Sequence, residues 1–393
     1  MYVRCIEQLQ HLEPIVSRWD ELAGGCVFRS WTWLNSWWRH YGTMAEETAL
    51  ASKKLQVLLV YEGDDSTGCQ APTQSSAYGA TSEQLVAILP CYSERSLTRG
   101  KVLRLLGDGE VCSDHLDLLV TATNAARAAD ALAEYLCGQT SQWDLIDFPA
   151  LDITQENTKI GHLIDALSER ECIVSQSPDQ NCWSVALPES WKEFLALQSK
   201  SHRKQLKRLE KRVLDTPSAT WHQVKLLEEF DSAWPLFVDL HQRRRESLGE
   251  AGCFASPRWA AFHEDVARQL LLEGRLRMSW LELEGEPVAA EYHFAGGRTT
   301  YVYQGGLDPN RLEDEPGRLS MIRTVQQAIA EGHRNFDLLR GDEPYKAHWR
   351  ATPKETYHVQ VIPKRTSAKW RYQTWNSVRG AARWVGQVTH MFS

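Results

Sequence analysis

The pattern of apolar and polar positions divides the chain into helices and strands that alternate along its whole length. In the first part, apolar residues at helical spacing predict helices at 11–23, 28–41 and 123–138. Short apolar runs predict strands at 55–61, 84–92, 101–106, 115–120 and 143–149. A polar, small-residue segment at 62–83 predicts a long hairpin loop. This alternation predicts an α/β fold.

The second part of the chain repeats the plan. Helices are predicted at 191–214, about 231–247, 257–273 and from Pro316, and strands near 219–225, 278–294, 299–306, 334–341 and 356–363. The helix at 123–138 leads into WDLIDF much as the helix at 317–331 leads into RNFDLL. This weak internal similarity supports tandem copies of one α/β unit. We therefore predict two domains, 1–185 and 186–365, followed by a tail at 366–393.

Composition narrows the classes of function. The 393 residues are 42% hydrophobic and 24% charged, which is ordinary for a globular protein, and the net charge of −7 argues against general nucleic-acid binding. No apolar stretch approaches the ~20 residues of a membrane span, and no signal peptide is evident, so we expect a cytoplasmic protein. Nine scattered cysteines without a C-x-x-C pair indicate neither a disulfide framework nor a metal site. G-x-S-x-G, H-E-x-x-H, Walker and G-x-G-x-x-G motifs are absent from the sequence.

The tail differs from the rest of the chain because it has no acidic residue after Glu355. Trp370, Trp375, Val378, Val385 and Val388 fall roughly on one helical stripe beside several basic residues. Such a helix suits an anionic membrane surface or a partner, which would place the protein peripherally at the inner membrane. Packing on its own domain with a solvated basic face is the alternative.

An anion site is predicted where the strand Thr299–Gly306 runs through a loop into the helix that begins near Pro316. A helix N-terminus offers free amides and a positive dipole end to phosphate. The backbone of Arg318, Leu319 and Ser320 would supply these amides, and the Arg311 and Arg318 side chains would add charge. Gly305, Gly306 and Gly317 would admit a ligand close to the backbone. An acidic loop that merely caps the helix is the alternative.

Candidates for proton transfer lie on the neighbouring strands. Alternation puts Glu291 and His293 on one face of their strand, so either could act as a general base if that face lines a cleft. Asp337 interrupts the apolar run FDLLRG, where a carboxylate is costly unless it is functional or is paired with Arg340 or Lys346. Tyr301 and Tyr303 on the next strand are further candidates for proton donation, and aromatic residues of the core or of a strand edge are the alternative.

A basic helix is predicted around residues 199–214 and carries a single acid, Glu210. Its cationic side chains include Arg203, Lys204, Lys207 and Arg208, and Arg244 adds to the positive charge further along the chain. Three interpretations remain open: a solvated face, a site for an anionic acceptor such as a nucleotide-linked sugar or a lipid phosphate, and contact with tRNA.

The order of these short motifs resembles that of a known family. A serine followed by a basic run ending in Arg-Leu, an LHQ-R segment, Pro316-Gly317, and FDLLRG followed by Tyr345-Lys346 and an aromatic residue are similar to the CelD/BcsL-like acetyltransferases. These are relatives of the FemABX peptidoglycan aminoacyltransferases. The usual GNAT signature R-x-x-G-x-G/A is missing, and only Pro316-Gly317 stands in its place.

The resemblance implies tandem GNAT-like domains, a degenerate N-terminal one and a C-terminal one that binds acetyl-CoA or another acyl-CoA without a metal. It implies that Lys346 stabilises an oxyanion or carboxylate and that Tyr345 contacts the acceptor. The acyl group would pass to an amine or hydroxyl of a cell-surface polysaccharide or envelope precursor. Transfer would be direct, because no Cys or Ser nucleophile with a base is visible. The alternatives are an aminoacyl-tRNA-dependent transferase and a non-catalytic scaffold of a polysaccharide-synthesis complex.

Overall fold

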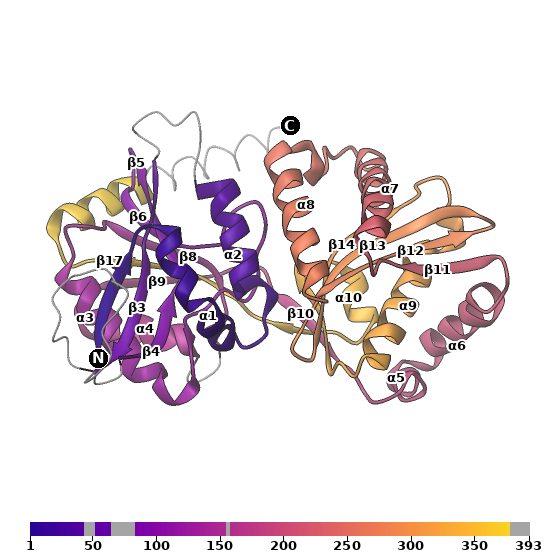
Figure 1. Ribbon diagram of the computed structural model, residues 1–393, viewed down its shortest axis with the longest axis horizontal. Coiled ribbons are helices and arrows are strands. Elements are labelled where there is room, and N and C mark those ends of the chain that lie inside the picture. The colour runs from indigo at the N-terminus through magenta and orange to yellow at the C-terminus, as the bar shows by residue number, and fades with distance from the viewer. Residues whose placement is uncertain (43–51, 64–82, 155–157, 378–393) are drawn as a thin grey trace. The chain divides into compact units, whose positions relative to one another are not determined.

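The computed structural model describes residues 1–42, 52–63, 83–154 and 158–377 (Figure 1). They form two compact units. Unit 1 comprises Met1–Gly24, Arg29–Asp179 and Thr356–Ser393, and unit 2 comprises Gly25–Phe28 and Gln180–Glu355. Mixed sheets flanked by helices make up each unit, so the predicted fold class is confirmed. Most of the predicted loop at 62–83 lies outside the described residues.

The chain passes between the units at other points than the predicted boundaries of 185 and 365. Strand β10 (Cys182–Ala186) pairs with β15 (Asn335–Arg340) in unit 2. Strand β17 (Tyr357–Ile362), which we expected to end the second domain, lies between β8 (Leu145–Leu151) and β9 (Ile173–Pro178) of unit 1. Strand pairing decides these assignments, and an apolar run in a sequence does not identify its partner.

Unit 1 contains a four-stranded and a six-stranded sheet. The first has the order β1-β3-β4-β7, with bounds Tyr2–Ile6, Val57–Glu62, Gln84–Leu89 and Leu119–Val120. The second has the order β2-β5-β6-β8-β17-β9, where β2, β5 and β6 span Lys53–Leu55, Cys91–Ser96 and Gly100–Leu105. The predicted strand at 84–92 divides between the two sheets at Pro90, which has no N–H to donate. The helices are α1 (Val16–Ala23), α2 (Trp31–Trp37), α3 (Ala125–Gly138) and α4 (Lys159–Glu169).

Unit 2 is built on one seven-stranded sheet of order β11-β12-β13-β14-β15-β10-β16. The remaining strand bounds are β11 Ala219–Gln223, β12 Leu276–Leu283, β13 Glu286–Gly296, β14 Thr299–Leu307 and β16 Thr352–Lys354. Its helices are α5 (Trp191–Leu197), α6 (Lys200–Leu209), α7 (Leu227–Glu246), α8 (Pro257–Leu272), α9 (Pro316–Ala330) and α10 (Pro344–His348). The predicted helix at 191–214 breaks at Gln198, because the Ser199 side chain caps a new helix by accepting from the amide of His202 at 3.3 Å.

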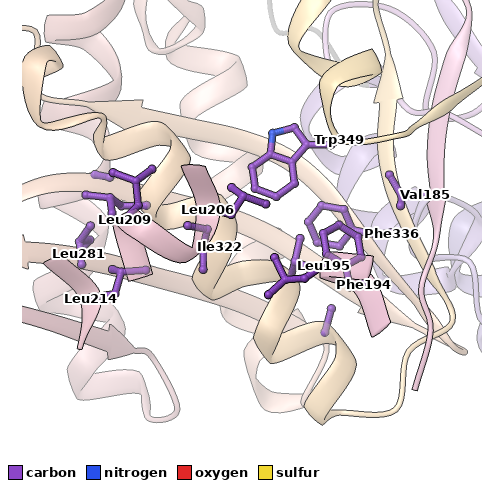
Figure 2. Close-up of a cluster of buried hydrophobic side chains, with 14 of the residues drawn as sticks. Val185, Phe194, Leu195, Leu206, Leu209, Leu214, Leu281, Ile322, Phe336 and Trp349 are labelled. Atoms are coloured by element: carbon purple, nitrogen blue, oxygen red, sulfur yellow. The ribbon is translucent and has the colours of Figure 1, made fainter. Parts of the chain in front are cut away.

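Two layers of helices cover the sheet of unit 2. Helices α7 and α8 lie on one face, and α5, α6 and α9 lie on the other (Figure 1). Figure 2 shows the core of the second layer, where Phe194, Leu206, Ile322 and Trp349 meet. All four side chains are buried, and each apolar side chain of this size contributes about 1.5–3 kcal/mol by leaving water. This core fixes α9, and with it the loop that precedes α9, against the sheet.

The predicted internal repeat is confirmed at the level of strand pairing. In unit 1, α3 leads into β8, which pairs in parallel with β6. In unit 2, α9 leads into β15, which pairs in parallel with β14. In each unit, the next strand of the sheet is the first strand after the chain has passed over from the other unit. This strand is β17 beside β8 in unit 1, and β10 beside β15 in unit 2. The two units therefore share one plan.

Ion pairs occupy the place in unit 1 where its two parallel strands separate. Strands β6 and β8 pair only at Val102–Leu145 and Leu103–Ile146. Next along β8, the buried Asp147 lies 3.3 Å from Arg104 Nη1 and accepts hydrogen bonds from His358 at 2.5 Å and Gln360 at 3.0 Å. Burial alone would raise the pKa of Asp147, but these hydrogen bonds and the Arg104 charge outweigh it and hold the pKa below its ordinary value.

The described part of the tail, residues 366–377, is helical and packs on unit 1. Ala368 is buried in a cluster with Val102, Leu145 and Ile362, and Tyr372 donates to Gln360 Oε1 at 3.1 Å. Trp370 faces away from this cluster and is 69% exposed. Residues 378–393, including three of the predicted stripe positions, lie outside the described residues.

Removing residues 356–393 should unfold unit 1. Val359, Val361 and Ile362 of β17 are at most 1% exposed, so their loss removes about 5–9 kcal/mol of apolar burial, comparable with the whole stability of a domain. We expect the truncated chain to lose the unfolding transition of unit 1 in calorimetry. A chain ending at Ser377 keeps β17 and should retain it, and a normal transition after deletion of 356–393 would contradict the strand assignment.

Candidate active site

The site begins where strands β14 and β15 separate. They pair in parallel at three positions only, Thr299–Asn335, Thr300–Phe336 and Tyr301–Asp337. Beyond these positions β14 continues to Leu307, while β15 leaves its neighbour after a bulge in its pairing with β10 and a left-handed Leu339 (φ 58°). Two parallel strands that part leave backbone N–H and C=O groups without a strand partner, and these groups can bind a ligand.

A second bulge lies on β14 beside this opening. Tyr292 is paired with Gln304 and His293 with Val302, so Tyr303 is the extra residue of β14. The Tyr303 amide donates to His293 Nδ1 at 3.2 Å instead of to a carbonyl of β13. His293 is 2% exposed. Because its Nδ1 accepts, its proton must lie on Nε2.

Glu291 is the acceptor of that proton's hydrogen bond. Its Oε2 lies 3.0 Å from His293 Nε2, which confirms that the two residues share a face, and its Oε1 accepts from Ser320 Oγ of α9. The Glu291 side chain is 12% exposed. Opposite it stands Gly305, where a Cβ would lie 3.0 Å from Oε2. The carboxylate is thus oriented by two donors and lies against the backbone of Gly305.

Tyr345 of α10 is electrostatically coupled to this carboxylate. Desolvation, Glu343 and Glu291 together raise the pKa of its phenol above the ordinary value. The residue remains 43% exposed. A phenol of this kind stays protonated at neutral pH and can donate a hydrogen bond or a proton.

Lys346 fixes the end of β15. Its ammonium is 1% exposed and donates to the carbonyls of Leu339, Arg340 and Gly341 at 3.1, 2.8 and 2.9 Å, and it lies 2.9 Å from a Glu343 carboxylate oxygen. An ammonium has three N–H donors, so it could contact an oxyanion only by releasing one of these partners. This geometry favours a role in positioning the strand end.

Asp337, a catalytic candidate from the sequence, is 5% exposed and accepts from the amide of Leu339 at 2.9 Å. That bond spans the bulge in β15. The carboxylate therefore supports the backbone conformation with which β15 departs from β14.

The start of α9 is less open than the sequence suggested. The amides of Arg318 and Leu319 both donate to the carbonyl of Glu315, at 2.9 and 3.1 Å, and Pro316 has no amide hydrogen. Ser320 uses its hydroxyl on Glu291. Side chains rather than these amides are the better candidates for holding phosphate here.

Positive side chains converge at this helix start around Glu315, which has φ 56°. Glu315 pairs with Arg318, lies 3.6 Å from Arg208 of α6, and accepts from Gln205 at 3.3 Å. Burial and the neighbouring Arg208 lower the pKa of Arg318, and burial and Arg318 lower the pKa of His202. These shifts report a positive potential, for which one carboxylate is the shared counter-ion.

Arg311, the other arginine predicted to bind phosphate, does not join this group. Its side chain donates to the Asp314 carboxylate at 2.5 Å.

The exposed face of α6 carries the predicted basic side chains. Lys204 and Lys207 are exposed, and within the part of the chain that the structure describes neither has a carboxylate in ion-pair range. Arg203 donates to the Ala196 carbonyl at 3.4 Å. Arg244 of α7 contacts the Ser247 hydroxyl at 3.5 Å. The α6 face is therefore cationic and available to an anion.

Two predicted glycines serve packing instead of ligand approach. A Cβ at Gly306 would lie 2.5 Å from the backbone nitrogen of His241, so glycine lets α7 sit directly on β14. A Cβ at Gly317 would lie 3.2 Å from a Leu307 methyl group. Of the three, only Gly305 has its Cβ position beside Glu291.

Tyr303 is on the opposite face of the sheet from Glu291, because the bulge reverses the alternation. Its hydroxyl lies 3.1 Å from Nε2 of His263 in α8, and His263 Nδ1 lies 3.2 Å from the Tyr292 hydroxyl. His263 is fully buried. No sequence pattern pointed to His263, since its helix is separated from β14 by more than one element.

Cys253 and His241 are a second pair that the sequence analysis missed. Cys253 Sγ, in the turn η6 (Cys253–Ala255), lies 3.5 Å from Nε2 of His241 in α7. They are 12 residues apart and on different elements, so no sequence motif joins them.

Among the described residues, no group of three or more His, Cys, Asp or Glu side chains is placed to hold a metal ion. No described helix is long and apolar enough to cross a membrane.

Comparison with known proteins identifies the domain that carries this geometry. The family model of the acetyltransferase (GNAT) domain matches residues 200–347, which include the opening, Glu291 and α9. This segment is therefore similar to a GNAT acetyltransferase domain, and the match supports an acyltransferase. A search of the curated proteins finds no similar sequence.

Two solved structures share the fold of nearly the whole chain. FemX is similar with a TM-score of 0.59 at 10% identity, over 92% of this chain and 97% of FemX. A conserved protein of unknown function from Bacteroides thetaiotaomicron VPI-5482 is similar with a TM-score of 0.52 at 11% identity, over 92% of this chain and 99% of that chain. At such identities the similarity concerns the fold alone, and it covers both units.

Replacing Lys346 by Met should lower the stability of unit 2, because the main role of Lys346 in the structure is to hold the end of β15. The change leaves the three carbonyls at 339–341 without their buried donor, and each unsatisfied group costs about 1–3 kcal/mol. We expect a fall of at least about 3 kcal/mol in the free energy of unfolding, measured by urea titration. Lys192→Met, at an exposed position of α5, is the matched control and should be close to neutral. Unchanged stability with lost activity would instead assign Lys346 to catalysis.

Proposed function

We propose that the protein transfers an acyl group, acetyl in the first instance, from acyl-CoA to an amine or hydroxyl of a cell-surface polysaccharide or envelope precursor. The observation that carries the proposal is the opening between β14 and β15 with the oriented carboxylate of Glu291 beside it. An acyl-CoA thioester is a linear ligand whose amide-rich arm can pair with the free edges of such strands.

Glu291 would be the general base. Its carboxylate takes the proton from the acceptor amine or hydroxyl as that group attacks the thioester carbonyl. His293 and Ser320 hold both oxygens in place, so that the base is oriented before the acceptor arrives. Tyr345 is suited to donating a hydrogen bond to the departing CoA thiolate, because its raised pKa keeps the phenol protonated at neutral pH.

Arg318 and Arg208 would hold the CoA phosphates. Both reach the shared carboxylate of Glu315, and a pyrophosphate offers the two guanidinium groups more acceptor oxygens than one carboxylate does. Phosphate would therefore displace Glu315 from this group.

The polysaccharide or envelope acceptor rests on the resemblance to CelD/BcsL-like acetyltransferases. Lys204 and Lys207 on α6, which have no ion-pair partner among the described residues, suit an acceptor that carries phosphate, such as a nucleotide-linked sugar. Trp370, exposed on the tail helix, suits a peripheral contact with a membrane or with a polysaccharide-synthesis complex.

A second candidate function is aminoacyl transfer from tRNA, which the resemblance to FemABX enzymes implies. It is favoured by one observation, the cationic and exposed face of α6. That surface would bind RNA phosphates with steep salt dependence. Retention of binding to a charged tRNA at 150 mM salt, together with no binding of acetyl-CoA, would select this function.

Calorimetric titration with acetyl-CoA tests the donor. We expect binding in the micromolar range, weakened about tenfold or more in Arg318→Ala through loss of a charge-assisted contact to phosphate. Arg334→Ala is the control, because Arg334 pairs with Glu189 beyond the C-terminal end of α9, opposite the end that carries Arg318, and its loss should leave binding unchanged. Absence of heat at millimolar acetyl-CoA would reject acyl-CoA as the donor.

Glu291→Gln tests the base. The amide keeps the shape of the carboxylate but cannot accept a proton, so the rate of CoA release with amino-sugar and nucleotide-sugar acceptors should fall by about 10²–10⁴. Acetyl-CoA binding should stay within twofold of the unmodified protein. A full rate in this variant would remove Glu291 from the mechanism.

A further inference from the structure

Cys253, His241 and Gln242 form a connected row of side chains on the face of the sheet opposite Glu291. Cys253 Sγ lies 3.5 Å from His241 Nε2, and His241 Nδ1 lies 3.2 Å from Gln242 Oε1. Gln242 Nε2 donates in turn to the carbonyl of Ala251 at 2.9 Å. This last bond fixes which end of the Gln242 amide faces the histidine.

The row determines the tautomer of His241. The Gln242 oxygen can only accept, so His241 Nδ1 carries the ring proton, and Nε2 faces the Cys253 thiol. Burial lowers the pKa of His241, and the nearby Arg245 lowers it further, while Gln242 and Gln304 oppose the shift. The imidazole is consequently neutral at pH 7 and able to take a proton from Cys253.

The pair borders the part of β14 that has left β15. His241 contacts Gln304, and its backbone nitrogen packs against Gly306, both beyond Tyr301, the last residue of β14 that pairs with β15. Cys253 is half-buried, so a reagent can reach it. A nucleophile, a base and a residue that orients the base together are the arrangement that activates a cysteine.

We propose that Cys253 is a site of S-acylation by acyl-CoA, an inference that rests on acyl-CoA being the donor. The thiol proton passes to His241 Nε2, and the thiolate attacks the thioester carbonyl. The bond between the carbonyl carbon and the CoA sulfur then breaks, and CoA leaves as a thiol with the proton from His241. One thioester replaces another, so the acyl group remains activated. The expectation of direct transfer assumed that no such nucleophile exists, and this pair removes that assumption.

The experiment is intact-mass and peptide analysis of the full chain after incubation with acetyl-CoA. We expect one acetyl group on the peptide that contains Cys253, released by hydroxylamine and absent in Cys253→Ser. Gln242→Leu, which leaves both Cys253 and His241 in place, should slow acylation about tenfold or more by freeing the ring to turn. Cys112→Ser is the matched control, because Cys112 is exposed and would be the first thiol to react without activation.

The outcomes separate this inference from the proposed function. If acetyl-CoA binds in calorimetry but Cys253 is acetylated no faster than Cys112, S-acylation is overturned and acyl-CoA remains the donor. If acetyl-CoA does not bind, both are rejected. Selective acetylation of Cys253 that is unaffected by Gln242→Leu would overturn the part assigned to the row of side chains.

Discussion

The buried ammonium of Lys346 is the interaction on which the site depends. It donates hydrogen bonds to three successive carbonyls at the end of β15. Just before them in the same strand, the Asp337 carboxylate accepts from the Leu339 amide across the bulge. Together they hold β15 in the course that takes it away from β14. The energy comes from satisfying buried polar groups that would otherwise each cost about 1–3 kcal/mol. A strand end that is over-determined in this way stays open without a ligand, so the donor would meet a preformed opening.

The bulge at Tyr303 divides the chemistry between two faces of one sheet. On one face, His293 contacts Glu291, and Glu291 accepts a hydrogen bond from Ser320 of α9. On the other face, Tyr303 contacts His263 of α8, and Gln304 contacts His241 of α7. One inserted residue thereby gives the opening an acidic, charged side and a side lined by neutral imidazole, phenol and thiol groups. The two sides suit different tasks, proton removal from an acceptor and covalent capture of an acyl group.

Sequence reasoning succeeded where a local rule decides the outcome. Period-2 alternation placed Glu291 beside His293, and the Pro-Gly start of α9 and the repeat of a helix before a buried strand were visible directly. It failed where tertiary contacts decide. Gly306 looked like a ligand contact, yet it makes room for α7. Lys346 looked like an oxyanion donor, yet its donors are engaged by carbonyls several residues away. The pairing of Cys253 with His241 depends on how the turn η6 folds back on α7, which no spacing records.

The insertion of β17 into unit 1 has a consequence for how the protein is made. The chain is synthesised from its N-terminus, so β8 and β9 exist long before Tyr357–Ile362 leaves the ribosome. Until then, both strands present unpaired edges on the nascent chain, a state in which pairing with other chains competes with folding. Unit 2 can complete its sheet first, because all strands of that sheet, β10 to β16, are synthesised before β17. The N-terminal half would therefore be the last part to fold. A shortage of chaperones, or a ribosomal stall while unit 2 is translated, would lengthen the time that unit 1 spends unfolded.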